Sequence, residues 1–297
     1  MPAAEVDVTV ELVRRLLREQ HADLADLPVE MVAHGWDNVV FRLGDELAAR
    51  LPRREAAAGI LLNEQRWLPV LAPHLPLPVP AAVRTGEAGS GYPWPWSIVP
   101  FLPGRPASDT PPSGAREAAA VLGGFLGALH MRATADAPVN PMRGVPLARR
   151  SSTYTRNLRI VAEQVDPAAV TRTWEAALAA PRWDGPAVWL HGDPHPANIL
   201  VDDGQVSAVI DFGDITAGDP ATDLSLAWMM LPADCHEAFR KAYRQAGDVP
   251  DSGSATDPLW LRARGWALNL SLAFLAHSAD NPQLRTIGHR TLAAVLA

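Results

Sequence analysis

The chain has one lysine, one cysteine and no long apolar run. Lys241 is the only lysine against 25 arginines, so any basic side chain required elsewhere must be an arginine. Cys235 has no second cysteine to pair with, which excludes an intramolecular disulfide and is compatible with a reducing compartment. No stretch of about 18 apolar residues is present, so the sequence predicts no membrane span.

Net positive charge is also absent. The 297 residues carry a formal net charge of −7, which makes nucleic acid an unexpected partner. Residues 1–20 mix charges of both signs and lack the apolar centre of a signal peptide. With 48% hydrophobic and 20% charged residues, the composition is that of a globular protein able to bury a substantial core. We therefore expect a cytoplasmic location.

The polar stretch after Leu190 carries the clearest chemistry. An apolar strand leads into a loop that contains Asp193 and Asn198, and a hairpin at residues 202–204 returns a strand that ends in Asp211. Two carboxylates and one carboxamide are thereby expected at the ends of neighbouring strands. Phosphoryl transfer in kinase-like enzymes needs such a set, because one Asp accepts the hydroxyl proton while an Asn and an Asp hold magnesium on the phosphates.

The spacing of these residues equals that of a protein-kinase catalytic loop. Four residues separate Asp193 from Asn198, and His191-Gly192-Asp193 stands where His-Arg-Asp would stand. Asp211-Phe212-Gly213 stands where the metal-binding Asp-Phe-Gly would. We predict Asp193 to be the catalytic base or hydroxyl-orienting residue, and Asn198 and Asp211 to be oxygen ligands of Mg²⁺. The alternative is a buried turn with helix-capping aspartates.

Other polar residues near this loop are expected to hold it in place. His191 and His195 are four residues apart, which on a helix would suit a zinc ion, but the prolines on either side of His195 disfavour a helix. We therefore expect His191 to form hydrogen bonds within the loop. Asp219 and Asp223 flank a predicted helix start, where capping and bracing of the loop are their expected roles.

These motifs resemble the aminoglycoside phosphotransferase (APH) family of small-molecule kinases. The resemblance rests on the loop from His191 to Asn198, on Asp211, and on Gly218-Asp219-Pro220-x-x-Asp223-Leu224, in the family's order. It implies an α+β, bilobal protein-kinase-like fold with a small antiparallel-sheet N-lobe and a mainly helical C-lobe. Residues 1–102 would bind the nucleotide, and residues 103–297 would hold the catalytic loop and the acceptor site. The implied cofactors are ATP (or GTP) and Mg²⁺, and the implied acceptor is a hydroxyl group of a small molecule.

The first hundred residues fit such an N-lobe. Three short strands are predicted, over residues 29–33, 39–43 and 47–51. The loop between the first two would cover the nucleotide phosphates, so Gly35 and Asn38 are its candidate contacts. That loop has one glycine where the protein-kinase pattern has three, and an ordinary hairpin is the alternative.

The third predicted strand carries Arg50, and a predicted helix over residues 56–68 carries Glu64. The family normally has a lysine on this strand that holds the α- and β-phosphates, and Arg50 stands in the matching place, fourteen residues before Glu64. A guanidinium can bind phosphate with two hydrogen bonds, so the resemblance assigns Arg50 to the phosphates and Glu64 to Arg50. Two alternatives are an exposed strand arginine and a nucleotide-binding pseudokinase or scaffold without transfer activity.

Two further strands, over residues 81–85 and 96–99, complete the predicted sheet. The segment after them, through Gly104, would be the crossing between lobes. In the family this crossing supplies backbone groups to the adenine edge, which implies Val99 and Phe101 here. Helices are expected afterwards, over residues 115–130, 147–165, 167–179, 219–231, 233–245, 258–277 and 283–296.

The acceptor is expected to be a small molecule without several positive charges. A protein substrate is disfavoured, because no Ala-Pro-Glu element and no long activation segment follow Asp211. Between His130 and Leu190 there are eight arginines against five acidic residues. Seven aspartates lie between His191 and Met230, but two of them, Asp193 and Asp211, already have roles in catalysis and metal binding. A weakly charged or anionic hydroxyl compound therefore fits better than a polycationic aminoglycoside, with Trp260 or Trp266 as a stacking surface.

Overall fold

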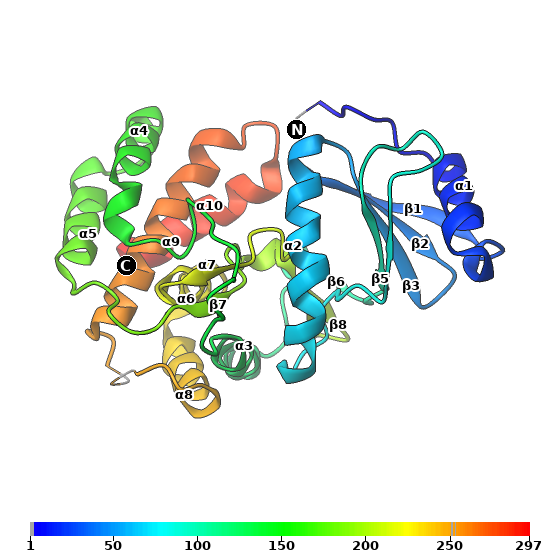
Figure 1. Cartoon of the computed structure of the whole chain (residues 1–297). Helices are drawn as coiled ribbons and strands as arrows, with labels where there is room; N and C mark the ends of the chain where they lie inside the picture. Colours follow the sequence, from blue (N-terminus) through cyan, green and yellow to red (C-terminus); the bar gives the residue numbers. More distant parts are fainter. Residues whose placement is uncertain (1–2, 251, 253) are drawn as a thin grey trace. The chain divides into compact units, whose positions relative to one another are not determined.

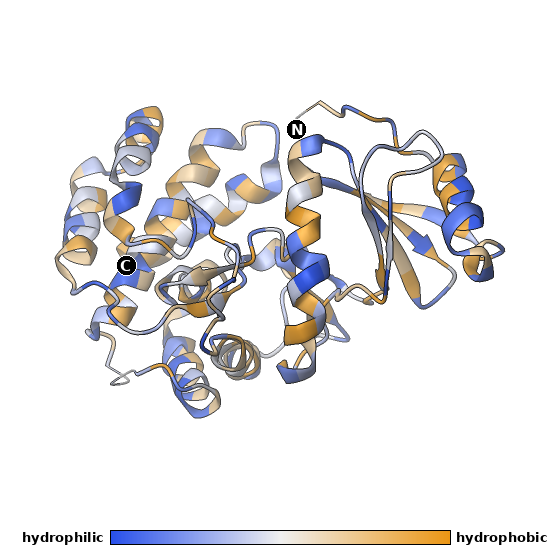
Figure 2. Cartoon of the chain, viewed as in Figure 1, coloured by the Kyte–Doolittle hydropathy of each residue, from blue (hydrophilic) through white to orange (hydrophobic). Residues whose placement is uncertain are grey.

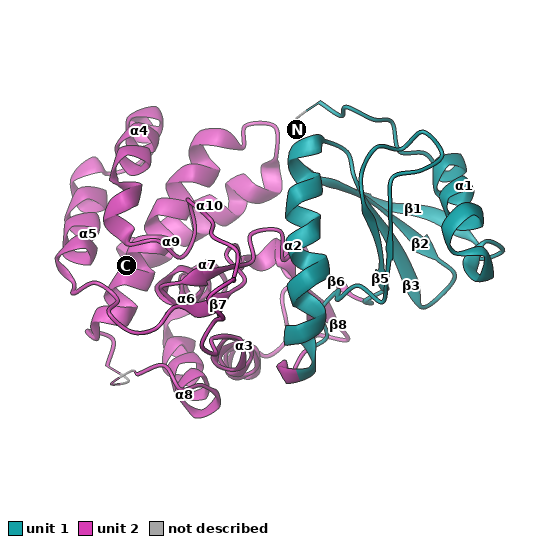
Figure 3. Ribbon diagram, viewed as in Figure 1, with its two compact units in different colours: residues 1–73, 78–103 teal, residues 74–77, 104–297 magenta. Residues whose placement is uncertain are grey.

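The computed structural model describes residues 3–250, 252 and 254–297 as two compact units (Figures 1 and 3). Unit 1 runs to Pro73 and again over Pro78–Pro103, and unit 2 comprises His74–Leu77 and Gly104–Ala297. The first two residues of the N-terminal stretch discussed above lie outside the described residues. Unit 1 is built on a sheet and unit 2 is mainly helical, which confirms the predicted α+β class.

Unit 1 contains a five-stranded antiparallel sheet in the order β1–β2–β3–β5–β4. The strands are β1 (Val29–His34), β2 (Asn38–Leu43), β3 (Leu47–Pro52), β4 (Arg84–Gly86) and β5 (Trp96–Pro100). Only β4 departs clearly from its predicted range, since it begins at Arg84 and not at Ala81. The Ala81 N–H donates to Val79 O, which turns the chain back on itself before strand pairing can begin.

Two helices accompany this sheet, α1 (Val10–Gln20) and α2 (Glu55–Leu71). Figure 2 shows α1 with both hydrophobic and hydrophilic colours, and its apolar residues Leu16 and Leu17 join one buried cluster with Ala49 and Leu51 of β3. Successive side chains of a strand point to opposite faces, so Arg50 points away from that cluster. On its own face Arg50 meets Glu64 of α2.

The helices of unit 2 surround α9. They are α3 (Ala115–Leu129), α4 (Ser151–Val161), α5 (Pro167–Ala179), α6 (Ala221–Leu224), α7 (Leu226–Met230), α8 (His236–Ala246), α9 (Pro258–His277) and α10 (Pro282–Leu296). α9 packs against α4, α5, α6 and α10, so it is buried on most sides. Trp260 and Trp266 are consequently 1% and 0% exposed, and the expected stacking surface is wrong. None of the helices in the described residues is long and apolar enough to cross a membrane.

Two of the predicted helices are broken. The segment predicted over 147–165 consists of a 3₁₀ turn (η3, Leu147–Arg150), α4 and a second 3₁₀ turn (η4, Ala162–Gln164). The segment predicted over 219–231 is divided between α6 and α7 at Ser225. The Ser225 hydroxyl donates to Thr222 O, so this side chain competes for a backbone acceptor at the break.

The strands of unit 2 form two small sheets. β7 (Val188–Leu190) pairs with β10 (Thr216–Gly218), whereas β8 (Ile199–Asp202) pairs with β9 (Gln205–Val209) and with β6 (Arg105–Pro106). The expectation that the strands before and after the catalytic loop are neighbours is therefore wrong, because β10 takes the pairing edge of β7. Asp211 also lies beyond the end of β9. Its φ of +63° turns the chain away from the strand direction.

Candidate active site

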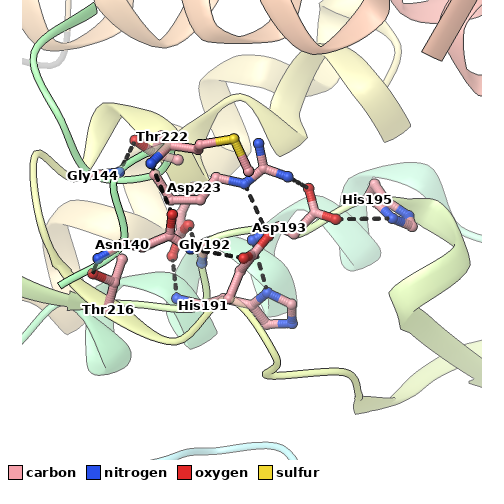
Figure 4. A network of polar contacts seen from close by, with 12 residues as sticks. Asn140, Gly144, His191, Gly192, Asp193, His195, Thr216, Thr222 and Asp223 are labelled. Carbon is pink, nitrogen blue, oxygen red and sulfur yellow. Dashed lines mark hydrogen bonds and ion pairs between the residues drawn. The ribbon is translucent and has the colours of Figure 1, made fainter. Parts of the chain in front are cut away.

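One buried carboxylate holds the loop after β7 in place (Figure 4). Asp223 accepts hydrogen bonds from the His191 N–H at 2.7 Å and the Gly192 N–H at 2.9 Å, and His130 Nε2 lies 3.3 Å from it. Both the carboxylate of Asp223 and the ring of His130 are fully buried. Burying a carboxylate is costly unless its oxygens accept hydrogen bonds, and the bonds that Asp223 accepts fix the loop backbone. Asp223 thus braces the loop, as expected.

Gly192 is required by the path of this backbone. Its φ is +90°, a conformation that side chains disfavour. A Cβ atom placed there would lie 2.2 Å from the carbonyl oxygen of Asp214. The loop and the segment around Asp214 can therefore approach each other only with glycine at position 192.

His191 is engaged in hydrogen bonds within the loop. Its Nδ1 accepts from the Asp193 N–H at 3.2 Å, so Nε2 carries the proton and donates to Ile210 O at 3.0 Å. Neither nitrogen is left to bind a metal. His195 also differs from a zinc ligand, because its Nδ1 accepts from the Ala197 N–H and its Nε2 faces Asp193 Oδ2 at 3.5 Å. The zinc alternative is therefore not supported.

Asp193 is held by an arginine that the sequence motifs did not indicate. Arg143 Nη2 lies 2.7 Å from Asp193 Oδ1, and Arg143 Nε lies 3.1 Å from Asp214 Oδ2. Burial is the largest single influence on Asp193 and raises its pKa. The charge of Arg143 and the hydrogen bond from His195 outweigh burial, so the pKa of Asp193 lies well below its ordinary value.

Asp214 responds to the same surroundings in the opposite direction. Burial is again the largest influence, and together with the nearby charge of Asp193 it raises the pKa of Asp214 despite the opposing charge of Arg143. The Asn140 Nδ2 atom also donates to Asp214, at 2.7 Å. Two carboxylates that share one arginine are thus separated in their pKa values, and Asp193 is the one kept ionised.

An irregular segment delivers Arg143 to this position (Figure 4). The Asn140 N–H donates to Thr216 Oγ1 at 3.0 Å, and the Gly144 N–H donates to Thr222 Oγ1 at 3.1 Å. Gly144 has a φ of +65° and packs directly against Gly218. Backbone contacts to β10 and α6 therefore fix the segment on both sides of Arg143. The run of arginines without acidic residues was visible in the sequence, but this placement was not.

Asn198 and Asp211 are linked to the catalytic loop through backbone and side-chain contacts. Asn198 Nδ2 donates to Asp193 O at 3.1 Å, and the Ile210 N–H donates to Asn198 O at 2.9 Å, immediately before the exposed Asp211. Because the amide nitrogen of Asn198 is used as a donor, Oδ1 is the atom that could bind a cation. The described residues contain no group of three or more His, Cys, Asp or Glu side chains that could hold a metal. Two hard oxygen donors still fit Mg²⁺, which takes its remaining ligands from phosphates and water.

In unit 1, Arg50 and Glu64 form a buried ion pair. Arg50 Nη1 lies 2.5 Å from Glu64 Oε2, and Nη2 lies 3.2 Å from Oε1, so both carboxylate oxygens are engaged. The two residues are 8% and 4% exposed. The pairing expected from their spacing is therefore present, and the alternative of an exposed strand arginine is wrong.

The loop that contains Gly35 and Asn38 is closed by its own backbone. The Gly35 N–H donates to Asn38 O at 2.9 Å, and Arg53 Nη1 donates to Gly35 O at 3.1 Å. Asn38 Oδ1 is buried and has no hydrogen-bond partner within the described part of the chain. The motifs did not indicate Arg53, which lies directly after β3, beside the loop that it contacts.

The backbone at the end of β5 is partly engaged. Val99 pairs with Ala48 of β3, and the Phe101 N–H donates to Glu46 O at 2.7 Å. A base contact at Phe101 would therefore have to use its carbonyl oxygen. The Phe101 ring also has the guanidinium of Arg42 4.6 Å from its centroid.

Solved structures that are similar to this chain include macrolide and aminoglycoside phosphotransferases. Macrolide 2'-phosphotransferase MphH from Brachybacterium faecium, an apoenzyme, is 26% identical to this chain, with 96% of this chain and 97% of that one covered and a TM-score of 0.62. A GDP and kanamycin complex of APH(2")-IIia is 18% identical, with 95% and 97% covered and a TM-score of 0.66. Macrolide 2'-phosphotransferase type I is 18% identical, with 98% and 99% covered and a TM-score of 0.63. Fold and loop together define a small-molecule phosphotransferase.

A comparison of the sequence with models of protein families shows the family to which the chain belongs. The model of the phosphotransferase enzyme family APH matches residues 28–266, which is most of the chain, and the chain belongs to this family. No curated protein sequence matches it. The match of the family model confirms the family resemblance predicted from the loop motifs. Nothing in these comparisons favours the alternative of a pseudokinase.

Proposed function

We propose that this phosphotransferase moves the γ-phosphoryl group of ATP or GTP, with Mg²⁺, to a hydroxyl group of a small molecule. The observation that carries the proposal is that Asn198 is hydrogen-bonded both to Asp193 and to the backbone next to Asp211. Its side chain donates to Asp193 O, and its carbonyl accepts from the Ile210 N–H. A turn with merely structural aspartates would not need this set of three.

Asp193 orients the acceptor hydroxyl in this proposal. Its depressed pKa makes it a weak base, but a carboxylate that is ionised before the reaction can accept a hydrogen bond from the hydroxyl and direct the oxygen at phosphorus. The hydroxyl oxygen forms the new P–O bond while the bond from phosphorus to the leaving diphosphate breaks, and the proton passes to Asp193 as the reaction completes. Positioning is the main demand of a metaphosphate-like transfer.

Asn198 Oδ1 and the Asp211 carboxylate would hold the cation. When bound, Mg²⁺ neutralises charge on the transferring phosphate. Asn198 is fixed from both ends, since its side chain and its carbonyl each form a hydrogen bond. Asp211 is exposed and can reorient toward the metal.

In unit 1 we assign the α- and β-phosphates to Arg50, with Glu64 as the residue that positions it. Glu64 engages both terminal nitrogens of Arg50, so the guanidinium is oriented before any nucleotide binds. Gly35 and Asn38 are proposed to contact the phosphates, and Val99 and the Phe101 carbonyl the base. Structures with the same fold that hold GDP or ADP support a nucleotide ligand.

A nucleotide-consumption screen of the purified protein tests this function. Diverse hydroxyl compounds are supplied with Mg·ATP or Mg·GTP, and Asp193→Ala serves as the blank for transfer. We expect phosphorylated product with the unaltered protein and none with the blank. Equal product from both proteins would remove Asp193 from its role.

A further inference from the structure

The part of unit 2 beside Asp193 is rich in arginine. From residue 137 to residue 162 the sequence has five arginines and neither Asp nor Glu. Arg143 is the first of them and reaches both Asp193 and Asp214. Arg150 ends η3, directly before α4, and Arg156 is exposed on α4. One short segment thus joins the catalytic carboxylate to several positive charges.

Arg150 is not satisfied by the fold. Its Nε atom is buried and has no hydrogen-bond partner in the part of the chain that the structure describes, and a buried guanidinium N–H without an acceptor is costly. Burial, and then the positive charges of Arg143 and Arg156, lower the pKa of Arg150. Arg150 is therefore repelled by the positive charges of both Arg143 and Arg156. An anion among them would relieve that repulsion and accept the unsatisfied N–H.

The neighbouring carboxylates are engaged elsewhere. Asp219 is paired with Arg262 at 2.8 Å, Asp223 braces the loop, and Asp214 is shared with Arg143 and Asn140. The exposed aspartates of the β8–β9 hairpin lie at its turn. Few carboxylates therefore remain for a substrate with several ammonium groups.

We propose that Arg150, together with Arg156, binds an anionic group of the acceptor, a carboxylate or a phosphate ester, close to Arg143 and Asp193. Guanidinium groups bind such anions with paired N–H donors in one plane. Arg143 adds positive charge between this subsite and the catalytic carboxylate. The inference rests on the proposed function, because it names the substrate class of that same site: hydroxyl compounds that carry an anionic group.

The test uses sets of hydroxyl compounds that differ only in charge. Gluconate supplies a carboxylate, glucitol 6-phosphate a phosphate ester, glucitol no charge and glucosamine a cation, and larger scaffolds are matched in the same way. Two measurements are made on each compound: binding, from the thermal stabilisation of the nucleotide-free protein, and transfer, from product formation with Mg·ATP. The variants are Arg150→Gln and Arg150→Lys, with Arg159→Gln as the control, an exposed arginine on the following helix α4.

We expect anionic members to bind and react in preference to their uncharged partners. In Arg150→Gln their KM should rise about tenfold or more with a smaller change in kcat, because a charged hydrogen bond to the acceptor is lost. Arg150→Lys should restore part of the affinity, and Arg159→Gln should match the unaltered protein. The carboxylate and phosphate arms show which anion is recognised.

The binding and transfer measurements separate a failure of the proposed function from a failure of the anionic subsite. Preferential binding of anionic compounds without transfer to any of them would contradict the proposed function and support the anionic subsite. Preference for cationic or uncharged compounds, or an anion preference unchanged in Arg150→Gln, would overturn the subsite whether or not transfer occurs. A loss of folding in Arg150→Gln is detected by its melting temperature, and Arg150→Lys then carries the comparison.

Discussion

Two arginine–carboxylate pairs serve the proposed reaction, and they are built in different ways. Arg50 and Glu64 come from a regular strand and a regular helix, and both are almost fully buried. Arg143 comes from an irregular segment, and its partner Asp193 is 24% exposed at the side chain. Burial and the contact between both terminal nitrogens of Arg50 and the Glu64 carboxylate hold the first pair in place. The second leaves part of the carboxylate proposed to orient the acceptor accessible to solvent.

The largest effect is expected at the buried pair. Arg50→Ala should lower the free energy of unfolding by about 3–5 kcal/mol, because it leaves the Glu64 carboxylate buried without its main partner. Arg84→Ala is the control, since its ion pair with Asp23 is exposed at 43% and 57% and should be worth about 1 kcal/mol or less. Denaturant unfolding measures both. Equal losses in the two variants would contradict the distinction between the pairs.

Nucleotide use by the same variants tests whether the pair acts as a unit. Arg50→Lys should keep part of the nucleotide affinity that Arg50→Ala loses. Glu64→Ala should resemble Arg50→Ala, and the double variant should lose little more than either alone. Fully additive effects on KM for the nucleotide would mean that Glu64 does not position Arg50.

The next effect concerns the loop that presents the second pair. Gly192→Ala should cost about 1–3 kcal/mol from backbone strain alone, and the contact with Asp214 O would add to it. Gly124→Ala is the matched control, because no atom lies within 4 Å of a Cβ at that position in α3. Thermal unfolding and transfer activity are measured together. Full activity in Gly192→Ala would show that the loop tolerates another path.

A further change weakens the support of the loop without adding bulk. Asp223→Asn should destabilise by about 1–3 kcal/mol, because the new amide cannot accept from both the His191 and Gly192 N–H groups. Turnover should fall more than nucleotide binding, since Asp193 follows directly. Asp202→Asn, on the exposed hairpin, should change neither quantity.

The smallest effect at neutral pH is expected from the second pair, Arg143 and Asp193. Arg143→Gln removes the charge that holds the pKa of Asp193 low, so the acid limb of the pH–rate profile should move to higher pH. Ionised Asp193 stabilises the fold above its unfolded-state pKa, and that contribution is lost as the pH falls through its depressed folded-state pKa. In Arg143→Gln the folded-state pKa of Asp193 is less depressed, so this contribution to stability should be lost at a higher pH. An unmoved acid limb would separate Arg143 from Asp193.

The sequence predicted one pair and missed the other for a physical reason. Arg50 and Glu64 lie on a strand and the helix that follows it, so a fixed spacing brings them together. Arg143 lies fifty residues before Asp193 in a segment without helix or strand. Its position depends on hydrogen bonds to Thr216 and Thr222, which are distant in the chain. No local pattern records such contacts.

In the fold, too, features defined by local sequence patterns were predicted, whereas those that depend on distant contacts were not. Antiparallel strands joined by short turns and helices such as α5 and α9 were predicted with nearly correct bounds, because apolar spacing and capping residues define them locally. The pairing of β7 with β10 was not predicted. Each strand has only three residues, which is too short for an alternating pattern, and their partnership depends on the packing of Gly144 against Gly218.

The most direct test of the central claim is isothermal titration of Mg·ATP into Asp193→Ala and Asp211→Ala, with turnover measured in parallel on an acceptor found in the screen. Asp193 should matter to turnover alone, because its proposed role is to orient the acceptor hydroxyl. Asp211 should matter also to magnesium-dependent nucleotide binding, because it would bind the cation. The account predicts nearly normal binding without turnover for Asp193→Ala, and weakened binding without turnover for Asp211→Ala. Undiminished binding and turnover in both variants would contradict it.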